Sequence, residues 1–84
     1  MSDLKIIVRT ADRTRKAEIT VPSTNMGKDI IDAAVSNWSL PTDTDYSIVN
    51  ITKVLAIIPT ETLEKSGVQE NDMLEVQPVL VAGK

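Results

Sequence analysis

Apolar and polar residues alternate in two short stretches near the start of the chain, as they do in half-buried strands. The first stretch, residues 4–11, places three aliphatic side chains on one side: Leu4, Ile6 and Val8. The second stretch, residues 17–21, does the same with Ala17, Ile19 and Val21. Because only the polar residues 12–16 separate the two stretches, the pattern predicts a β-hairpin with one buried face.

The next stretch, residues 26–38, has the spacing of an amphipathic helix. Its apolar positions form two adjacent rows: Met26, Ile30 and Ala34, and Ile31, Val35 and Trp38. Pro22 ends the preceding strand, and the candidate N-cap residues that follow it are Ser23, Thr24 and Asn25. Gly27 lowers helix stability by about 1 kcal/mol relative to alanine in a helix interior, and by less in the first turn, where it lies.

Three further strands are expected in the second half of the chain. Residues 46–50 and 53–58 form a second hairpin around a tight turn, and residues 60–63 begin a short helical turn that Gly67 ends. An apolar run after Asp72 then forms the last strand, and helical crossovers allow it to lie parallel to the first strand. The predicted class is α+β, a mixed sheet of about five strands with one main helix on one face. Residues 1–78 are expected to form the domain and residues 79–84 a strand end and tail.

The composition excludes several classes of function. The chain has 84 residues, 42% of them hydrophobic, which suits one globular domain. It contains no cysteine and no histidine, so it lacks disulfides, thiol nucleophiles and the usual zinc ligands. We therefore expect a protein that is not an enzyme and needs no metal or cofactor.

The net charge of −3 gives no electrostatic reason to expect nucleic-acid binding. With no apolar run long enough to span a bilayer and no signal peptide, we expect a cytoplasmic protein. We also expect a monomer.

Two groups of charged residues could be interpreted as sites. The basic residues Arg9, Arg13, Arg15 and Lys16 gather near the first turn, where they form either a solvated hairpin tip or a phosphate site. The tip is the simpler interpretation, since no aromatic residues lie among them. The pairs Asp43 with Asp45 and Glu61 with Glu64 could be drawn as catalytic carboxylates. Without histidine, cysteine or a glycine-rich phosphate loop, they are better explained as solvated loop charges.

Over nearly its whole length the chain resembles the ubiquitin-like β-grasp superfamily. Residues 4–10 look like the first strand of ubiquitin, and residues 17–23, ending Val-Pro-Ser, look like its second strand and helix entry. Ile48 and Leu55 have the separation of two core positions of the family. Residues 62–63, 67–68 and 72–76 match its short helix and last strand. The resemblance implies the ubiquitin-like β-grasp fold.

The resemblance also implies specific functional positions. Ala82 and Gly83 fall where conjugated members carry their terminal di-glycine, and Lys84 would be an extension that a peptidase removes. Lys53 matches the commonest chain-extension lysine, although it also fits an ordinary surface lysine. The recognition patch of the family falls on Ala11, Val49 and Gln77. Since only Val49 keeps apolar bulk there, we do not expect the usual receptors of ubiquitin to bind this chain.

Three functions follow from the resemblance, and all act through protein–protein contacts. The first is a protein modifier conjugated through Gly83 after removal of Lys84, with an E1-like adenylating enzyme and a trimming peptidase as partners. The second is a non-conjugated accessory or scaffold protein, because the run from residue 28 to residue 76 also looks like the bacterial YukD/EsaB-type proteins of type VII secretion. Its partners would be secretion-machinery proteins. The third is a sulfur carrier, disfavoured by Lys84 and by the missing second glycine. Alternatively, Gly83 belongs to an ordinary frayed terminus.

Overall fold

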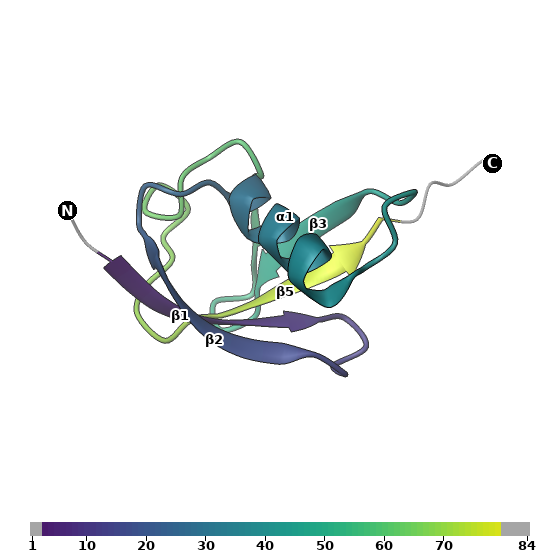
Figure 1. Ribbon diagram of the computed structural model, residues 1–84. Helices are drawn as coiled ribbons and strands as arrows, with labels where there is room; N and C mark the ends of the chain where they lie inside the picture. Colours follow the sequence, from purple (N-terminus) through teal and green to yellow (C-terminus); the bar gives the residue numbers. More distant parts are fainter. Residues whose placement is uncertain (1–2, 80–84) are drawn as a thin grey trace.

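A computed structural model describes residues 3–79, which fold as a five-stranded mixed sheet with one helix across one face (Figure 1). In chain order the elements are β1 (Asp3–Thr10), β2 (Lys16–Pro22), α1 (Gly27–Trp38), β3 (Tyr46–Asn50), β4 (Leu55–Ile57) and β5 (Met73–Pro78). The strands lie in the order β2-β1-β5-β3-β4, and β5 is parallel to β1 and antiparallel to β3. The predicted α+β class and the parallel pairing of the first and last strands are both confirmed.

The N-terminal hairpin has the predicted inner face. Leu4 pairs with Val21, Ile6 with Ile19, and Val8 with Ala17. Ile6 and Val8 are buried, whereas the β2 partners are half-buried because β2 lies at the edge of the sheet. In the turn, the Asp12 carboxylate accepts hydrogen bonds from the Thr10 hydroxyl (2.6 Å), from the Thr14 backbone N–H (3.0 Å) and from the Thr14 hydroxyl (2.8 Å). These bonds lower the pKa of Asp12 to about 2, so the carboxylate that organises the turn is ionised at neutral pH.

Helix α1 buries the predicted stripe against the sheet. Ile30, Ile31 and Ala34 are buried in the core, and Val35 and Trp38 pack against its edge. The core residues on the other elements include Ile6, Ile48, Leu63, Leu74 and Val76, each at most 1% exposed. The helix ends at Ser39, which adopts a left-handed conformation (φ 51°), and the Leu40 N–H donates to the Val35 carbonyl.

The start of α1 differs from the prediction. The N-cap is Met26, not Ser23, Thr24 or Asn25, and its N–H donates to the Asp29 carboxylate (2.9 Å). The next two N–H groups, of Gly27 and Lys28, donate to the carbonyls of Glu61 and Pro59. A distant backbone segment therefore satisfies donors that a side-chain cap would otherwise satisfy. Such a contact cannot be deduced from the local sequence.

The second hairpin forms, but its second strand is shorter than predicted. Residues 51–54 make the turn, so Lys53 and Val54 precede β4 instead of belonging to it. Val54 has a positive φ of 56° and is 83% exposed, a costly backbone conformation for a β-branched residue. Leu55, expected in the core, is 53% exposed, whereas Ile57 is 4% exposed and pairs with Ile48. The assignment of Leu55 to the core was therefore wrong.

In the segment between β4 and β5, the short helical turn predicted to begin at residues 60–63 and to end at Gly67 appears as a hydrogen-bonded turn at residues 63–67, in which the Ser66 N–H donates to the Thr62 carbonyl (3.0 Å). The turn at residues 63–67 places Leu63 in the core with 0% exposure. Its end is marked by Gly67, whose φ is 78°, as predicted for a breaker at this position. Val68 is then buried, and its N–H donates to the Leu63 carbonyl (3.0 Å).

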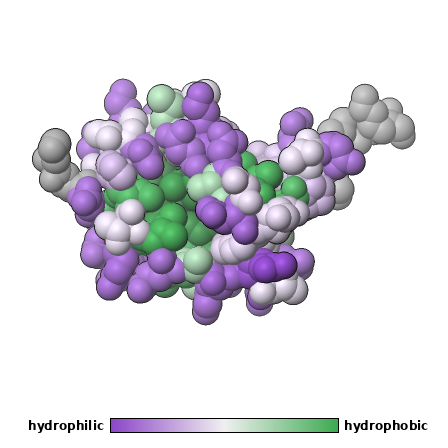
Figure 2. All heavy atoms as spheres, viewed as in Figure 1, coloured by the Kyte–Doolittle hydropathy of each residue, from purple (hydrophilic) through white to green (hydrophobic). Residues whose placement is uncertain are grey.

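Hydrophobic residues remain visible between α1 and the β1–β2 hairpin (Figure 2). A small apolar groove lies there, with Ala17 and Ile19 of β2 on one side and Ala33 of α1 on the other. Helix α1, which is the only helix that the structure describes, is too short and too polar to cross a lipid bilayer.

Candidate functional site

The sheet face opposite α1 is the candidate site for protein binding (Figure 1). Alternation along the strands directs one set of side chains away from the helix. These residues are Lys5, Ile7 and Arg9 on β1, Met73, Glu75 and Gln77 on β5, and Ser47 and Val49 on β3. We call this surface the open face.

The three residues of the expected recognition patch gather at one corner of the open face. Val49 lies directly opposite Glu75 in the β3–β5 pair, and Gln77 is its diagonal neighbour, because Gln77 pairs with Ser47. Ala11 follows the last residue of β1, and its N–H donates to the Val76 carbonyl (3.1 Å) beside Gln77. The structure therefore brings together residues that lie far apart in the sequence.

A polar cluster that the sequence analysis missed occupies the centre of this face. The Arg9 Nε lies 2.7 Å from one Glu75 carboxylate oxygen, and the Gln77 amide donates to the other at 2.6 Å. Glu75 is only 6% exposed, so this carboxylate is held almost out of water by its two neighbours. The parallel register of β1 and β5 places Arg9 beside Glu75, and only this register would have indicated the cluster.

The hydrogen bonds keep Glu75 ionised in spite of its burial. The hydrogen bond from Gln77 is the largest influence and lowers the pKa, burial opposes it, and the hydrogen bond and charge of Arg9 lower the pKa further. The resulting pKa lies below the ordinary value of 4.5. The corner that would carry an apolar patch in the family therefore adjoins a buried ion pair, which lies beside Val49 at the centre of the face.

We expect the Glu75→Gln substitution to reduce the acid sensitivity of the fold. Because the pKa of Glu75 is lower in the folded chain than in the unfolded chain, its ionisation stabilises the fold above the ordinary value of 4.5. This contribution decreases as the pH falls through the lower, folded pKa. Urea unfolding at pH 7 and at successively lower pH would show a smaller loss of stability in the variant. An equal loss in both proteins would contradict the prediction, and Glu18→Gln, an exposed position on β2, is the control.

Lys53 does not lie free on the surface. Its Nζ is 2.9 Å from the Oδ2 atom of Asp72 and 3.2 Å from the Oδ1 atom, and its side chain is 30% exposed. To act as an acceptor in a chain-extension reaction, the amine would have to leave this carboxylate and lose a proton. The role of Lys53 as an acceptor therefore stays a prediction. In the structure its ammonium group is paired with the buried Asp72.

The basic residues near the first turn do not gather into a phosphate site in the part of the chain that the structure describes. The guanidinium of Arg9 points to Glu75, whereas Arg13, Arg15 and Lys16 are exposed around the hairpin turn. Among residues 3–79, no three histidine, cysteine, aspartate or glutamate side chains gather closely enough to hold a metal ion.

The predicted conjugation tail, Ala82, Gly83 and Lys84, lies outside the described residues. The last described residue is Val79, just after β5, and its N–H donates to the Asp45 carbonyl (2.8 Å). This bond holds the end of β5 beside the segment that leads into β3.

Comparisons with known proteins reveal similarity at the level of structure. No family model matches the chain, and no curated protein matches its sequence. Among solved structures, a ubiquitin from Caldiarchaeum subterraneum is similar with a TM-score of 0.77 and 25% identity, over 98% of this chain and all of that one. A protein designed on the basis of ubiquitin has a TM-score of 0.77 and 16% identity, over 98% of this chain and 95% of that one.

A third solved structure, whose title describes molecular mimicry of SUMO that promotes DNA repair, has a TM-score of 0.74 and 12% identity. The similarity extends over 95% of this chain and 94% of that one. The second and third similarities, at such low identity, concern the fold alone. The TM-scores of 0.74 to 0.77 show that the fold of the described residues is similar to all three. The chain is therefore a member of the ubiquitin-like β-grasp superfamily.

Proposed function

We propose that this chain is a protein modifier, attached to target proteins through Gly83 after Lys84 has been removed. The observation that supports the proposal most is the similarity to the archaeal ubiquitin, which extends over 98% of this chain and the full length of the other protein. The absence of histidine and cysteine from the sequence supports a non-catalytic role, in which enzymes act on the chain.

The proposed reaction uses the carboxylate of Gly83. A peptidase hydrolyses the Gly83–Lys84 bond, and an E1-like enzyme joins the new carboxylate to the AMP of ATP and releases pyrophosphate. The ε-amine of a target lysine then displaces AMP, loses a proton and forms an isopeptide bond. Glycine suits this step because it has no side chain to obstruct a narrow enzyme channel.

The open face is the proposed surface for partner proteins. Val49 provides apolar contact at the corner beside Ala11 and Gln77, while the pair of Arg9 and Glu75 makes the adjoining centre polar. A partner would therefore need hydrogen-bonding groups that complement these side chains. This composition supports a set of partners different from the usual receptors of ubiquitin.

The test is a search for conjugates in cells of the source organism that express the chain with an N-terminal tag. Tryptic cleavage of a conjugate would leave residues 66–83 attached to the target lysine, since no lysine or arginine lies between Lys65 and Lys84. We expect this branched peptide with the full chain and with a variant that ends at Gly83. A variant that ends at Val81 should produce no conjugates.

Two results would contradict the proposal. Intact mass that always includes Lys84, together with no branched peptide, would exclude conjugation under the conditions tested. Conjugates formed equally by the variant that ends at Val81 would exclude Gly83 as the point of attachment. If partners still bound to the chain without residues 80–84, the non-conjugated binding module would be the better explanation.

A further inference from the structure

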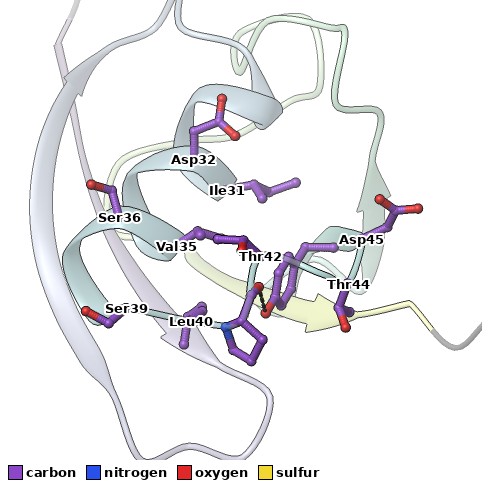
Figure 3. Close-up of a pocket in the computed structure, with 11 residues that line it drawn as sticks. Ile31, Asp32, Val35, Ser36, Ser39, Leu40, Thr42, Thr44 and Asp45 are labelled. Carbon is purple, nitrogen blue, oxygen red and sulfur yellow. Dashed lines mark hydrogen bonds between the residues drawn. The ribbon is translucent and has the colours of Figure 1, made fainter.

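A groove separate from the open face lies between the second half of α1 and the segment that leads into β3 (Figure 3). Its volume is about 690 Å³, within the range of roughly 300–1,000 Å³ that is typical of binding sites. The aliphatic side chains at its surface are Ile31 and Val35 from the helix and Leu40 from the segment that follows it. Ile31 belongs to the core, and Val35 and Leu40 are partly buried against it, so a ligand could extend the apolar packing.

Local hydrogen bonds hold the groove in shape. The Tyr46 hydroxyl donates to the Pro41 carbonyl (2.8 Å), which ties the segment to the start of β3 (Figure 3). The Leu40 N–H donates to the Val35 carbonyl at the end of the helix, and the Val79 N–H donates to the Asp45 carbonyl at the opposite wall. A ligand would therefore meet a preformed surface, which reduces the entropy lost on binding.

All charged side chains that line the groove are negative. Asp32 lies on the helix and Asp45 lies on the opposite wall, and both are exposed. Within the part of the chain that the structure describes, neither of them forms an ion pair. The last turn of α1 carries no basic residue, so the negative end of the helix dipole adds to the same potential.

We propose that this groove binds a basic peptide segment of a partner protein. An aliphatic side chain of the peptide would pack on Ile31, Val35 and Leu40, and lysine or arginine side chains near it would reach Asp32 and Asp45. The negative lining disfavours nucleic acid, phosphate compounds and acidic peptides. Because the groove lies on the helix side of the sheet, its occupation is compatible with a second partner on the open face, and it does not depend on conjugation.

The test begins with selection of binders to the full chain from a random peptide library displayed on phage. We expect the enriched peptides to carry lysine or arginine next to an aliphatic residue. The most enriched peptide, made synthetically, should shift the amide resonances of residues 31–46 in a titration of the isotope-labelled chain. The double variant Asp32→Asn/Asp45→Asn should bind this peptide roughly fivefold more weakly, since two exposed ion pairs are lost.

The matched control is the double variant Asp3→Asn/Glu18→Gln, which makes the same change in net charge at exposed positions outside the groove. It should bind the peptide as the unmodified chain does. No enrichment above a selection without protein would overturn the proposal, as would equal affinity for the Asp32→Asn/Asp45→Asn variant or resonance shifts confined to the sheet. If the resonances of residues 31–46 shift with protein concentration in the absence of peptide, a second copy of the chain occupies the groove, and the proposal of a basic peptide is overturned.

Discussion

Replacement of Asp72 by alanine is expected to lower the free energy of unfolding by about 3–5 kcal/mol, the usual effect of removing one partner from a buried ion pair. Asp72 is only 3% exposed. Its carboxylate accepts hydrogen bonds from the Asn50 amide, the Gln69 backbone N–H and the Lys53 ammonium, each at 2.9 Å. Alanine would leave all three donors without this acceptor, and Asn50 is itself 1% exposed.

The position of Asp72 explains why the effect should be large. The three donors come from the end of β3, from the turn before β4 and from the loop before β5, so one carboxylate connects three segments. Burial is the largest single influence on its pKa and raises it, but the hydrogen bonds from Asn50, Gln69 and Lys53 together outweigh burial and lower the pKa below the ordinary value. The carboxylate is therefore ionised at neutral pH, so its removal should lower the free energy of unfolding by the full amount at pH 7.

Urea denaturation at pH 7, followed by circular dichroism, would measure the effect. The control is Asp43→Ala, which removes an exposed aspartate in the loop before β3 and should change stability by less than about 0.5 kcal/mol. Equal losses in the two variants would show that the buried carboxylate contributes no more than a surface charge. A folded Asp72→Ala variant of unchanged stability would also contradict the prediction.

The second large effect is expected at Gly27, where valine should lower the free energy of unfolding by about 2–3 kcal/mol through overpacking. A Cβ atom at this position would lie 3.0 Å from Cγ2 of Ile57, 3.2 Å from Cα of Pro59 and 3.3 Å from Cγ2 of Ile48. The contact with Pro59 is with the backbone, which cannot move aside as a side chain can. Alanine should also destabilise the fold, by about 1 kcal/mol, although it is the better helix former.

The matched control is Gly67→Asn, since nothing lies within 4 Å of a Cβ atom there and asparagine tolerates the positive φ of 78°. This variant should lose less than about 1 kcal/mol, and thermal or urea unfolding would compare the three proteins. If Gly27→Ala were as stable as the unmodified chain or more stable, helix propensity would outweigh packing at this position, and the interpretation of Gly27 as a close-contact residue would be wrong.

The patterns that the sequence predicted correctly are local. The alternation around Ile6 and Ile19 and the helical rows around Ile30 and Ala34 each follow from the geometry of one element, and both were confirmed. The sequence also allowed the first and last strands to lie parallel, because the connections between them were long enough, and the structure shows that they do. Each of these inferences needs only neighbouring residues or the length of a connection.

The errors occur where pairing in space decides the outcome. The apolar run at residues 53–58 looks like a strand, but only residues 55–57 form one, and Leu55 is exposed although it lies on the same face as the buried Ile57. β4 lies at the edge of the sheet, so a residue on its inner face can still be left uncovered. At the start of α1, the backbone of residues 59–61 supplies the acceptors that a local cap was expected to supply.

The sequence by itself therefore determined the class of the fold and the faces of the first hairpin and the helix, whereas the recognition role of Ala11, Val49 and Gln77, which the family resemblance implies, stays a prediction. Only the tertiary structure decided that Arg9 forms an ion pair with Glu75, that Lys53 forms one with Asp72, and that Asp32 and Asp45 line one groove. The physical reason is the separation along the chain of the residues that each feature involves. Periodicity reports which side of an element is buried, whereas charge pairs and grooves depend on register between elements that are distant in the chain.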